Sequence, residues 1–336
     1  MANINDVAER AGVSPTTAKR AIHSPDKLAP ATLERVQQAI DDLHYEPDRL
    51  ASALRRGQSR TIGLIVGNII EPFFAHLTRV IGEEVRARGY TLLIADSEYN
   101  ADLELEQLQA FNGNRIGGLI IRSGYGESNI GYLKRMQARG TAIVEIDYFY
   151  PDSPFSHVMM DNSGCIREGV AHLAALGHER IAALGTYDEK VLPDERSSAF
   201  PRVMAEFGLT LPAAYQRVIE PTAQNAYALT KELMALDLPP TALFATTGNL
   251  ATGAFRALRE LGLSIPEDVS LLSFDDYPWT SLVDPPVDVI EQPVEAMGRA
   301  AVEILFDSVK GNPFVVRRRF QGRLIRRGSC APPQPD

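Results

Sequence analysis

The chain has 336 residues, of which 45% are hydrophobic, and a formal net charge of −9. This length allows two or three domains with sizeable cores. No apolar run approaches the roughly 20 residues that span a bilayer, and the N-terminus lacks a basic stretch followed by an apolar one, so we expect a cytoplasmic protein. Two cysteines far apart in the sequence exclude a disulfide framework or zinc-finger spacing within one chain.

The acidic residues are concentrated after the first 60 residues. Residues 1–60 contain nine lysines and arginines and eight acidic residues, whereas residues 61–336 contain 25 and 35. If the N-terminal segment binds DNA, its near-neutral charge attracts phosphates only modestly. Useful affinity would then require two such segments on one site and would fall steeply with salt.

Residues 4–22, INDVAERAGVSPTTAKRAI, have the pattern of two short helices joined by a glycine turn. Asn3 and Asp6 favour the start of the first helix, and Gly12 supplies a left-handed residue at its end. Such a pair of helices predicts a DNA-binding helix-turn-helix, and a small solvated hairpin is the alternative. The groove-reading residues are expected on the second helix and its cap: Ser14, Pro15, Thr16, Thr17, Lys19, Arg20 and His23.

Two further helical patterns complete the N-terminal segment. Apolar residues at helical spacing predict a third helix that covers the first two: Leu33, Val36, Ile40 and Leu43. A short pattern over residues 48–56 ends at Gly57. A helix of about nine residues is marginal in water, so we expect it to fold only on DNA beside a partner helix, and a basic flexible linker is the alternative.

From Thr61 onward, short apolar runs alternate with helical patterns. The runs TIGLIV, YTLLIA, GGLII and AIVEI are separated by helical stretches such as 72–88 and 102–112. A second round, RIAALG, TALFA and SLLSF, begins near Asp161, and residues 294–310 are expected to return as a helix to the first round. The pattern predicts two doubly wound α/β subdomains with parallel sheets. Ligands of such sheets bind at the carboxyl ends of the strands, so we expect a cleft between the two sets of strand ends.

Candidate ligand residues follow the predicted strands. After the first strand, Phe73 and Phe74 could form an apolar wall of the cleft, with core packing as the alternative. Arg122 follows GGLII, where burial would demand an anionic partner, although many such arginines lie at the surface. Asp147 ends AIVEI and Asp161 begins the second round. Either carboxylate could accept ligand hydroxyls or could instead cap a helix or crossover.

The chain resembles the lac-repressor (LacI/GalR) family of transcription regulators. The resemblance begins with residues 3–66, which open NINDVAERAGVSPTTAKRAI and close RTIGLIV, and continues through GHERIAALG, PEDVSLLSFDD, PPVDVIEQPVEAMG and LIRRGS. It implies a helix-turn-helix head at 1–46, a hinge helix or linker at 47–60, and an effector-binding and dimerisation core of periplasmic-binding-protein type at 61–336. The core would divide into an N-subdomain (about 61–160 and 293–320) and a C-subdomain (about 161–292 and 321–330).

The resemblance also implies how the hinge contacts DNA. In the family, pairs of hinge helices enter the minor groove at the operator's centre, and Leu54 stands at the position of the wedging leucine. Arg49, Arg55 and Arg56 can then hold the adjacent phosphates.

In the second round, the resemblance implies further effector contacts. Arg196 in DERSSAF matches the arginine of the family's R-x-x-G-F motif, with Ala199 in place of the glycine, and it offers a planar fork to hydroxyls or a carboxylate. Asp275, directly after SLLSF, is the matching carboxylate for sugar hydroxyls.

Two departures from the family bear on the effector's charge. Thr247 and Gly248 replace the Asn-Asp of many members and are followed by Asn249, which leaves one acidic group fewer. Trp279, the single tryptophan, follows Asp275 where an indole could lie over a ligand, or could fill a seam between the subdomains. The pattern resembles the branch of the family that senses sugar acids.

The sequence therefore predicts a homodimeric repressor of a near-palindromic operator, controlled by a sugar acid or sugar. A free sugar-binding protein of the same fold is the alternative. An α/β hydrolase of carbohydrates or nucleosides is a remote one, because the chain contains no GxxxxGK[ST], GxGxxG after a strand, HExxH or GxSxG. Six scattered histidines show no metal spacing, and we expect neither a metal nor another cofactor.

Overall fold

The computed structural model describes residues 2–45, 59–124, 129–150, 153–185, 195–311 and 314–335. The chain divides into two compact units, Met1–Ser59 and Arg60–Asp336. The expected hinge helix, with Arg49, Leu54, Arg55 and Arg56, lies outside the described residues. Within the described residues, every helix is too short or too polar to cross a membrane.

The first unit is built from α1 (Ile4–Ala11), α2 (Pro15–His23), the 3-10 turn η1 (Pro25–Lys27) and α3 (Pro30–Asp42). The caps agree with the prediction. The Asn3 side chain accepts hydrogen bonds from the backbone N–H groups of Asn5 and Asp6, and the Asp6 carboxylate accepts one from the N–H of Asn3. Gly12 has a φ of +63°, and the Ser14 hydroxyl accepts the N–H of Thr17 at 3.1 Å.

Small side chains hold these three helices together. The buried core of the unit consists of Val7, Ala8, Ala11, Ala18, Ala21, Val36 and Ala39. Because most of these side chains are single methyl groups, the helix backbones can cross closely. The partly buried Leu33, Ile40 and Leu43 pack around this core, so α3 covers α1 and α2 as the spacing predicts.

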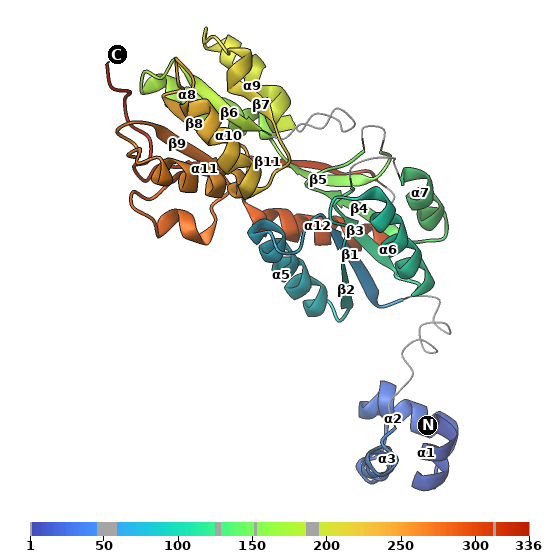
Figure 1. The fold of residues 1–336 in the computed structure, drawn as a ribbon. Coiled ribbons are helices and arrows are strands. Elements are labelled where there is room, and N and C mark those ends of the chain that lie inside the picture. The colour runs from blue at the N-terminus through green and yellow to red at the C-terminus, as the bar shows by residue number, and fades with distance from the viewer. Residues whose placement is uncertain are drawn as a thin grey trace. The chain divides into compact units, whose positions relative to one another are not determined.

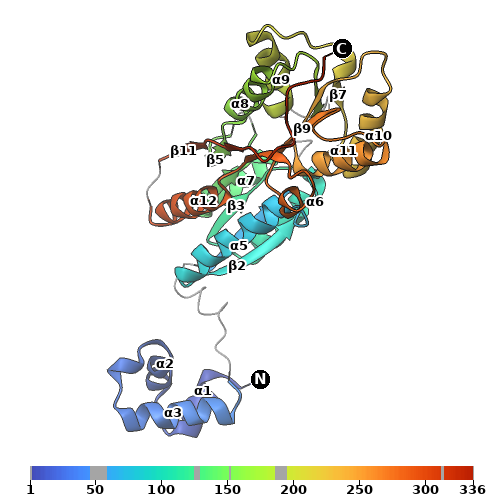
Figure 2. The same ribbon diagram turned by 90° about the vertical axis from the view of Figure 1, so that its left-hand side faces the viewer.

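The second unit contains two sheets (Figure 1). The first has the order β11-β5-β4-β3-β1-β2 and is parallel throughout. Its strands are β1 (Thr61–Val66), β2 (Thr91–Asp96), β3 (Gly118–Ile121), β4 (Ala142–Ile146), β5 (Ser156–Met160) and β11 (Arg317–Phe320). Helices α5 (Pro72–Ala87) and α12 (Val294–Val309) pack together on one face (Figure 2), and α6 (Ala101–Gly113) and α7 (Ile130–Ala138) cover the other.

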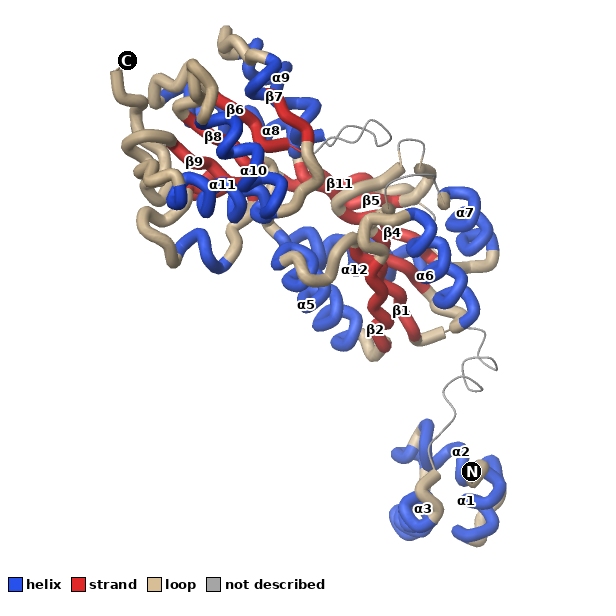
Figure 3. The backbone as a smooth tube through the Cα atoms, viewed as in Figure 1, coloured by secondary structure: helices blue, strands red, loops and turns tan. Residues whose placement is uncertain are grey.

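The second sheet has the order β12-β10-β9-β8-β6-β7. Its strands are β6 (Ile181–Gly185), β7 (Gln216–Val218), β8 (Ala242–Ala245), β9 (Ser270–Phe274), β10 (Asp288–Glu291) and β12 (Arg323–Ile325). Helices α8 (Asn162–Ala175) and α9 (Glu195–Glu206) lie on one face, and α10 (Ala223–Met234) and α11 (Gly248–Glu260) lie on the other (Figure 3). Two 3-10 turns, η2 (Ala213–Tyr215) and η3 (Pro278–Ser281), complete this half.

The prediction of parallel sheets is correct with one exception, since β12 runs antiparallel to β10. The helix after β10, α12, packs on β3, β4 and β5 of the first sheet, as predicted. The short edge strands β7, β11 and β12 and the buried strands β5 and β10 were not predicted. The edge strands contain arginine or glutamine, β5 contains a serine and a histidine, and β10 begins and ends with an acidic residue, so none reads as a continuous apolar run.

Two glycines provide a matched test of helix-to-sheet packing. A Cβ added at Gly169 in α8 would lie 2.6 Å from the Phe244 ring, whereas one at Gly82 in α5 would meet side-chain atoms at 3.7 Å or more. We expect Gly169→Ala to destabilise by about 1–3 kcal/mol through overpacking, and Gly82→Ala to stabilise by about 0.5–1 kcal/mol through helix propensity. Thermal unfolding of both variants checks this, and a stabilised Gly169→Ala would contradict the packing.

Candidate functional site

Arg122 lies at the carboxyl end of the first sheet, directly after β3. Its side chain is only 4% exposed, and its Nε lies 3.5 Å from a carboxylate oxygen of Asp147. Nη1 donates to the backbone carbonyl of Ser123 at 2.7 Å. The guanidinium carbon lies 4.6 Å from the ring centre of Tyr99 and 4.9 Å from that of Tyr148. The charge that the sequence predicts here is therefore held between a carboxylate and two aromatic faces.

Glu71 adds a second carboxylate to this end of the sheet. The Tyr99 hydroxyl donates to Glu71 Oε1 at 2.8 Å. Burial raises the pKa of Glu71 to about 7; the Tyr99 hydrogen bond opposes this, and the negative charges of Asp275 and Asp147 add to it. Because Asp275 comes from the other sheet, both sets of strand ends share one electrostatic environment.

Phe73 and Phe74 follow Glu71 at the start of α5. Their exposed fractions are 7% and 2%, and both belong to the main hydrophobic cluster of the second unit. Their ring centres are 4.9 Å apart in an edge-to-face arrangement. The structure therefore places both rings in core packing, with Phe74 also 6.2 Å from Tyr99.

The second buried arginine, Arg196, lies at the start of α9 beside the second sheet. Its Nε donates to Asn162 Oδ1 at 2.9 Å and its Nη1 to the carbonyl of Thr246 at 3.1 Å. The guanidinium carbon lies 3.9 Å from the ring centre of Phe274. Arg196 is thus held over Phe274, the last residue of β9, which directly precedes Asp275.

Asp275 is buried and has a left-handed φ of +70°. Its carboxylate accepts the N–H of Gly248 at 3.3 Å and the Nε2–H of Gln292 at 2.5 Å. Burial raises the pKa of Asp275, and the charge of Arg196 opposes this increase. The negative charge of Asp147, whose φ is +66°, raises the pKa of Asp275 further. The two aspartates share this unusual backbone conformation at equivalent strand ends.

Sequence reasoning missed Tyr277, which lies beside Asp275. Its ring occupies the space that a side chain at position 248 would need, since a Cβ there would lie 2.5 Å from the ring. Its buried hydroxyl has no hydrogen-bond partner within the described residues. Burial raises its pKa, and the charges of Asp275 and Glu71 add to the increase. The Gly248 of the unusual Thr-Gly pair was the available signal, because glycine marks a close approach.

Other predicted effector residues have structural partners. Asp161 caps α8 by accepting the Gly164 N–H at 3.0 Å. Thr247 caps α11 through the N–H of Leu250, and the next side chain on that helix, Asn249, is half-buried. Trp279 packs on Phe255 at 5.5 Å within the apolar cluster of the second sheet, with its indole N–H buried and unpartnered among the described residues.

In the first unit, α2 presents a polar face. Its exposed side chains, with the cap residue, are Ser14, Pro15, Thr16, Lys19 and Arg20. Thr17 is half-buried, with its hydroxyl 2.9 Å from that of Ser14, and the His23 side chain lies outside the described part of the chain. Ala18 and Ala21 form the opposite, buried face. The predicted groove-reading residues that are described therefore share one accessible side of the helix.

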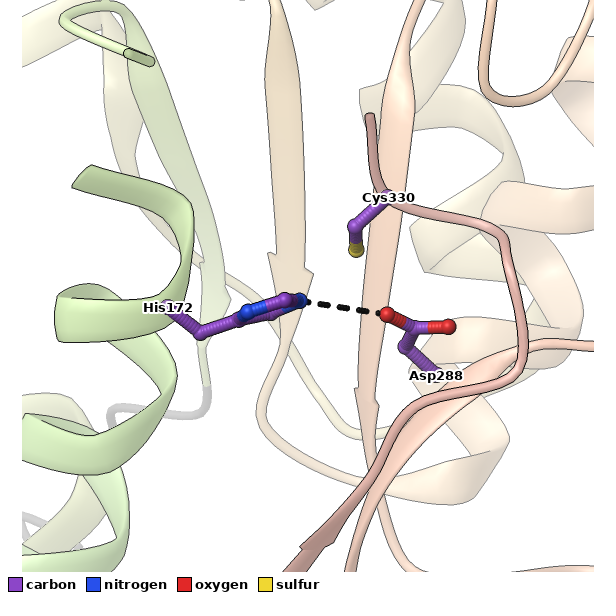
Figure 4. A group of neighbouring side chains, drawn as sticks. All are labelled: His172, Asp288 and Cys330. Atoms are coloured by element: carbon purple, nitrogen blue, oxygen red, sulfur yellow. Dashed lines mark hydrogen bonds and ion pairs between the residues drawn. The ribbon is translucent and has the colours of Figure 1, made fainter. Parts of the chain in front are cut away.

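One cluster in the second half has the composition of a metal site (Figure 4). Among the described residues, His172, Asp288 and Cys330 alone bring three candidate ligand atoms within 4.8 Å of one another. However, one Asp288 oxygen accepts three backbone N–H groups from residues 327–329, and the other lies 3.2 Å from His172 Nε2. Burial also raises the pKa of the Cys330 thiol. The cluster therefore acts as an anchor for the C-terminal segment.

Comparison with known proteins identifies both units. Residues 3–48 match the family model "Bacterial regulatory proteins, lacI family", and residues 170–330 match "Periplasmic binding protein-like domain". The chain is 32% identical to the HTH-type transcriptional regulator MalR of Streptomyces coelicolor, over 97% of this chain and 96% of that one. It is 30% identical to the HTH-type transcriptional repressor PurR of Aliivibrio salmonicida, over 92% and 93%.

Solved structures agree in fold. The lac repressor dimer bound to operator and the anti-inducer ONPF superposes with a TM-score of 0.86 at 23% identity, covering 98% of this chain and 99% of that one. The transcriptional regulator CelR in complex with cellobiose gives a TM-score of 0.72 at 26% identity, covering 98% and 100%. A LacI family regulator from Enterococcus faecium with bound ribose gives 0.69 at 26%, covering 81% and 99%.

The raised pKa of Glu71 predicts a pH-dependent stability. The pKa of Glu71 is about 7 in the folded protein and about 4.5 in the unfolded chain. Its stabilising contribution to the free energy of unfolding is therefore fully present below pH 4.5 and is lost as the pH rises through 7. Glutamine cannot ionise, so Glu71→Gln should melt about 2 °C above the wild type at pH 8 and show no such gain at pH 5. Thermal unfolding at both pH values checks this, with the exposed Glu267→Gln as control; an equal difference at both pH values would contradict it.

Proposed function

The chain belongs to the lacI family of bacterial regulatory proteins, and we propose that it is a repressor that binds a near-palindromic operator as a homodimer. It is a DNA-binding transcriptional regulator with an effector-binding core. The lac repressor, which has the same fold, is a dimer on its operator. A near-neutral head on each protomer supports the dimer, because two heads on one DNA site add their modest affinities.

The DNA contacts are assigned to α2. Its accessible face carries Lys19 and Arg20 beside small hydroxyl side chains, which is the chemistry that reads base edges and phosphates in the major groove. Residues 1–46 form the head in this proposal and residues 47–60 the hinge. Arg49, Leu54 and Arg55 are its hinge contacts, and these rest on the family resemblance.

The effector site is assigned to the cleft between the two sets of strand ends. The observation that carries this assignment is one buried arginine near one aspartate on each side. Arg122 forms an ion pair with Asp147, and Arg196, held over Phe274, lies close enough for its charge to act on Asp275. Alternating carboxylates and guanidinium groups suit a ligand rich in hydroxyls, with or without a carboxylate. Cellobiose and ribose, bound by two relatives of the same fold, are ligands of this chemistry.

We add two residues to this proposed site and rank three others lower. Tyr277 joins it as a hydroxyl that a ligand can partner, and Glu71 joins it as a carboxyl that changes charge near neutral pH. Trp279, Asp161 and Thr247 remain proposed contacts of lower priority, because each already has a structural role. The N-subdomain (about 61–160 and 293–320) and the C-subdomain (about 161–292 and 321–330) follow the membership of strands in the two sheets.

We further propose that the protein is not an enzyme and works in the cytoplasm, where its DNA is. Its relatives are transcriptional repressors. Arg122, Arg196 and Asp275 form hydrogen bonds or an ion pair with backbone groups or neighbouring side chains, which suits binding and not turnover. Effector binding would change the populations of two subdomain arrangements and, through them, the pairing of the hinge segments.

A test of DNA recognition uses the operator selected by the full-length protein from random DNA. A chain lacking residues 1–58 should remain folded and lose operator binding, because the core strands begin at Thr61.

Arg20→Ala should reduce discrimination between the operator and point-mutated sites by about 1–3 kcal/mol. Fluorescence anisotropy measures both effects. Arg35→Ala, which removes the same charge from the exposed side of α3, is the control; equal loss of discrimination in both variants would contradict the assignment.

A test of the effector site starts with a thermal-shift screen of sugars and sugar acids. Arg196→Ala should abolish binding of every ligand found, because its fork also serves hydroxyls. Arg122→Ala should weaken the binding of sugar acids by more than about 1.5 kcal/mol and leave the affinity for neutral sugars nearly unchanged. Calorimetric titration of both variants with a neutral sugar and a sugar acid measures these changes in affinity. Tight binding of a neutral hexose or pentose with no response to gluconate would overturn the preference for an acid while leaving the repressor assignment intact.

A further inference from the structure

Two buried carboxylates lie near Arg122, outside the proposed ligand contacts. Glu104 lies on α6 and Glu145 lies on β4, and neither side chain has any exposed surface. Burying a carboxylate is costly unless several donors compensate for the lost water. Their donors therefore show what these two residues hold in place.

The donors to Glu104 come from the segments that follow β3 and β4. The backbone N–H of Gly124 donates to Oε2, while Asn129 Nδ2 donates to Oε1 at 2.9 Å and the Tyr150 hydroxyl to the same oxygen at 3.3 Å. Asn129 also donates to the carbonyl of Ala101 at 2.8 Å, which ties this region to the start of α6.

The donors to Glu145 come from the same two segments. The Ser123 hydroxyl donates to Oε1 at 3.3 Å and the Ser153 hydroxyl to Oε2. Burial raises the pKa of Glu145 to about 7, the Ser153, Tyr150 and Ser123 hydrogen bonds oppose this, and the charge of Glu104 adds to it. Burial raises the pKa of Glu104 as well, and its hydrogen bonds and the positive charge of Arg122 oppose this. The charged or titratable groups that act on the two carboxylates are therefore each other, Tyr150 and Arg122.

The two carboxylates hold the residues directly beside Arg122. Glu145 holds the side chain of Ser123 and Glu104 holds the backbone of Gly124, while the Arg122 guanidinium donates to the carbonyl of Ser123. A Cβ added at Gly124 would lie 3.2 Å from the backbone at Asn100, so the segment packs closely on the start of α6. Displacing residues 123–124 would therefore move the groups that orient the guanidinium.

We propose that Glu104 and Glu145 are positioning residues that fix the 122–124 segment and so hold Arg122 toward Asp147 and the effector cleft. The role of Arg122 in effector binding rests on the proposed function. The holding of Arg122 by the two carboxylates is a separate statement, which can be tested without a ligand. The competing explanation is that the pair only stabilises the N-subdomain.

The test measures how fast phenylglyoxal modifies Arg122 in the full chain, by mass spectrometry of its peptide, with the exposed Arg115 as internal reference. Glu145→Ala should raise the Arg122 rate by about fivefold or more, because the segment opens more often. Glu145→Gln, which keeps an acceptor and a donor for the two serines, should stay within about twofold of the wild type. Glu106→Gln, on the exposed side of α6, should leave the rate unchanged.

Ser123→Ala keeps the test decisive if Glu145→Ala fails to fold. It removes one hydroxyl that Glu145 holds, and it should also raise the Arg122 rate by about threefold. A lower melting temperature with Arg122 modified at the wild-type rate, in either variant, would overturn the proposal in favour of a purely structural role. Failure of Glu145→Gln to restore slow modification would overturn it as well.

Binding of D-gluconate and D-ribose, measured by calorimetry on the same variants, separates this proposal from the proposed function. If either probe binds, Glu145→Ala should weaken gluconate at least about threefold more than ribose, because gluconate alone carries a carboxylate for Arg122. Equal weakening of both would contradict the positioning of Arg122. If neither probe binds the wild type, the proposed ligand class fails, and the modification rates still decide whether the carboxylates hold Arg122.

Discussion

The proposed effector site depends on three short connections between the two sheets. The chain leaves the first sheet after β5 and again after β11, and it returns after β10, through residue 161, residues 321–322 and residues 292–293 respectively. One or two residues span only a few ångströms, so the strand ends on both sides must lie close together. Asp147 therefore raises the pKa of Asp275, although more than 120 positions separate the two residues.

These connections are also linked chemically to the site. Gln321 donates to Asp161 at 2.8 Å, which joins two connections, and Gln292 in the third donates to the buried carboxylate of Asp275. A ligand that engages Asp275 thus acts on a group already bonded to a connection between the subdomains. On the proposed function, this is how occupancy of the cleft would favour one arrangement. The change in the free-energy difference between the two arrangements can be no larger than the difference in the ligand's binding free energy for them.

Sequence reasoning succeeded where a residue's role follows from its position along one strand or helix. Caps such as Asn3 and Ser14 are of this kind, and so is the placement of Arg122 and Asp275 directly after apolar strands. The contact of these two residues with an effector stays a prediction. It could not find Glu104, Glu145 or Tyr277, because their roles depend on which distant segments pack against them. A glutamate within a helix or strand usually faces solvent, and only the tertiary structure shows that donors from residues 123–153 surround these two.

Glycine at position 248 removes one acidic group, but it does not leave the proposed effector site without carboxyl groups. The ring of Tyr277 fills the space beside Gly248, and Glu71, Asp147 and Asp275 still place three carboxyl groups near two arginines. Burial raises the pKa of both Glu71 and Asp275, so the negative charge that an anionic ligand would meet depends on the protonation of these two groups. Because its pKa is about 7, Glu71 crosses between its protonated and ionised states near neutral pH. On the proposed function, the preference for an acid over a neutral sugar would therefore depend on the protonation of Glu71 and not only on the number of acidic residues.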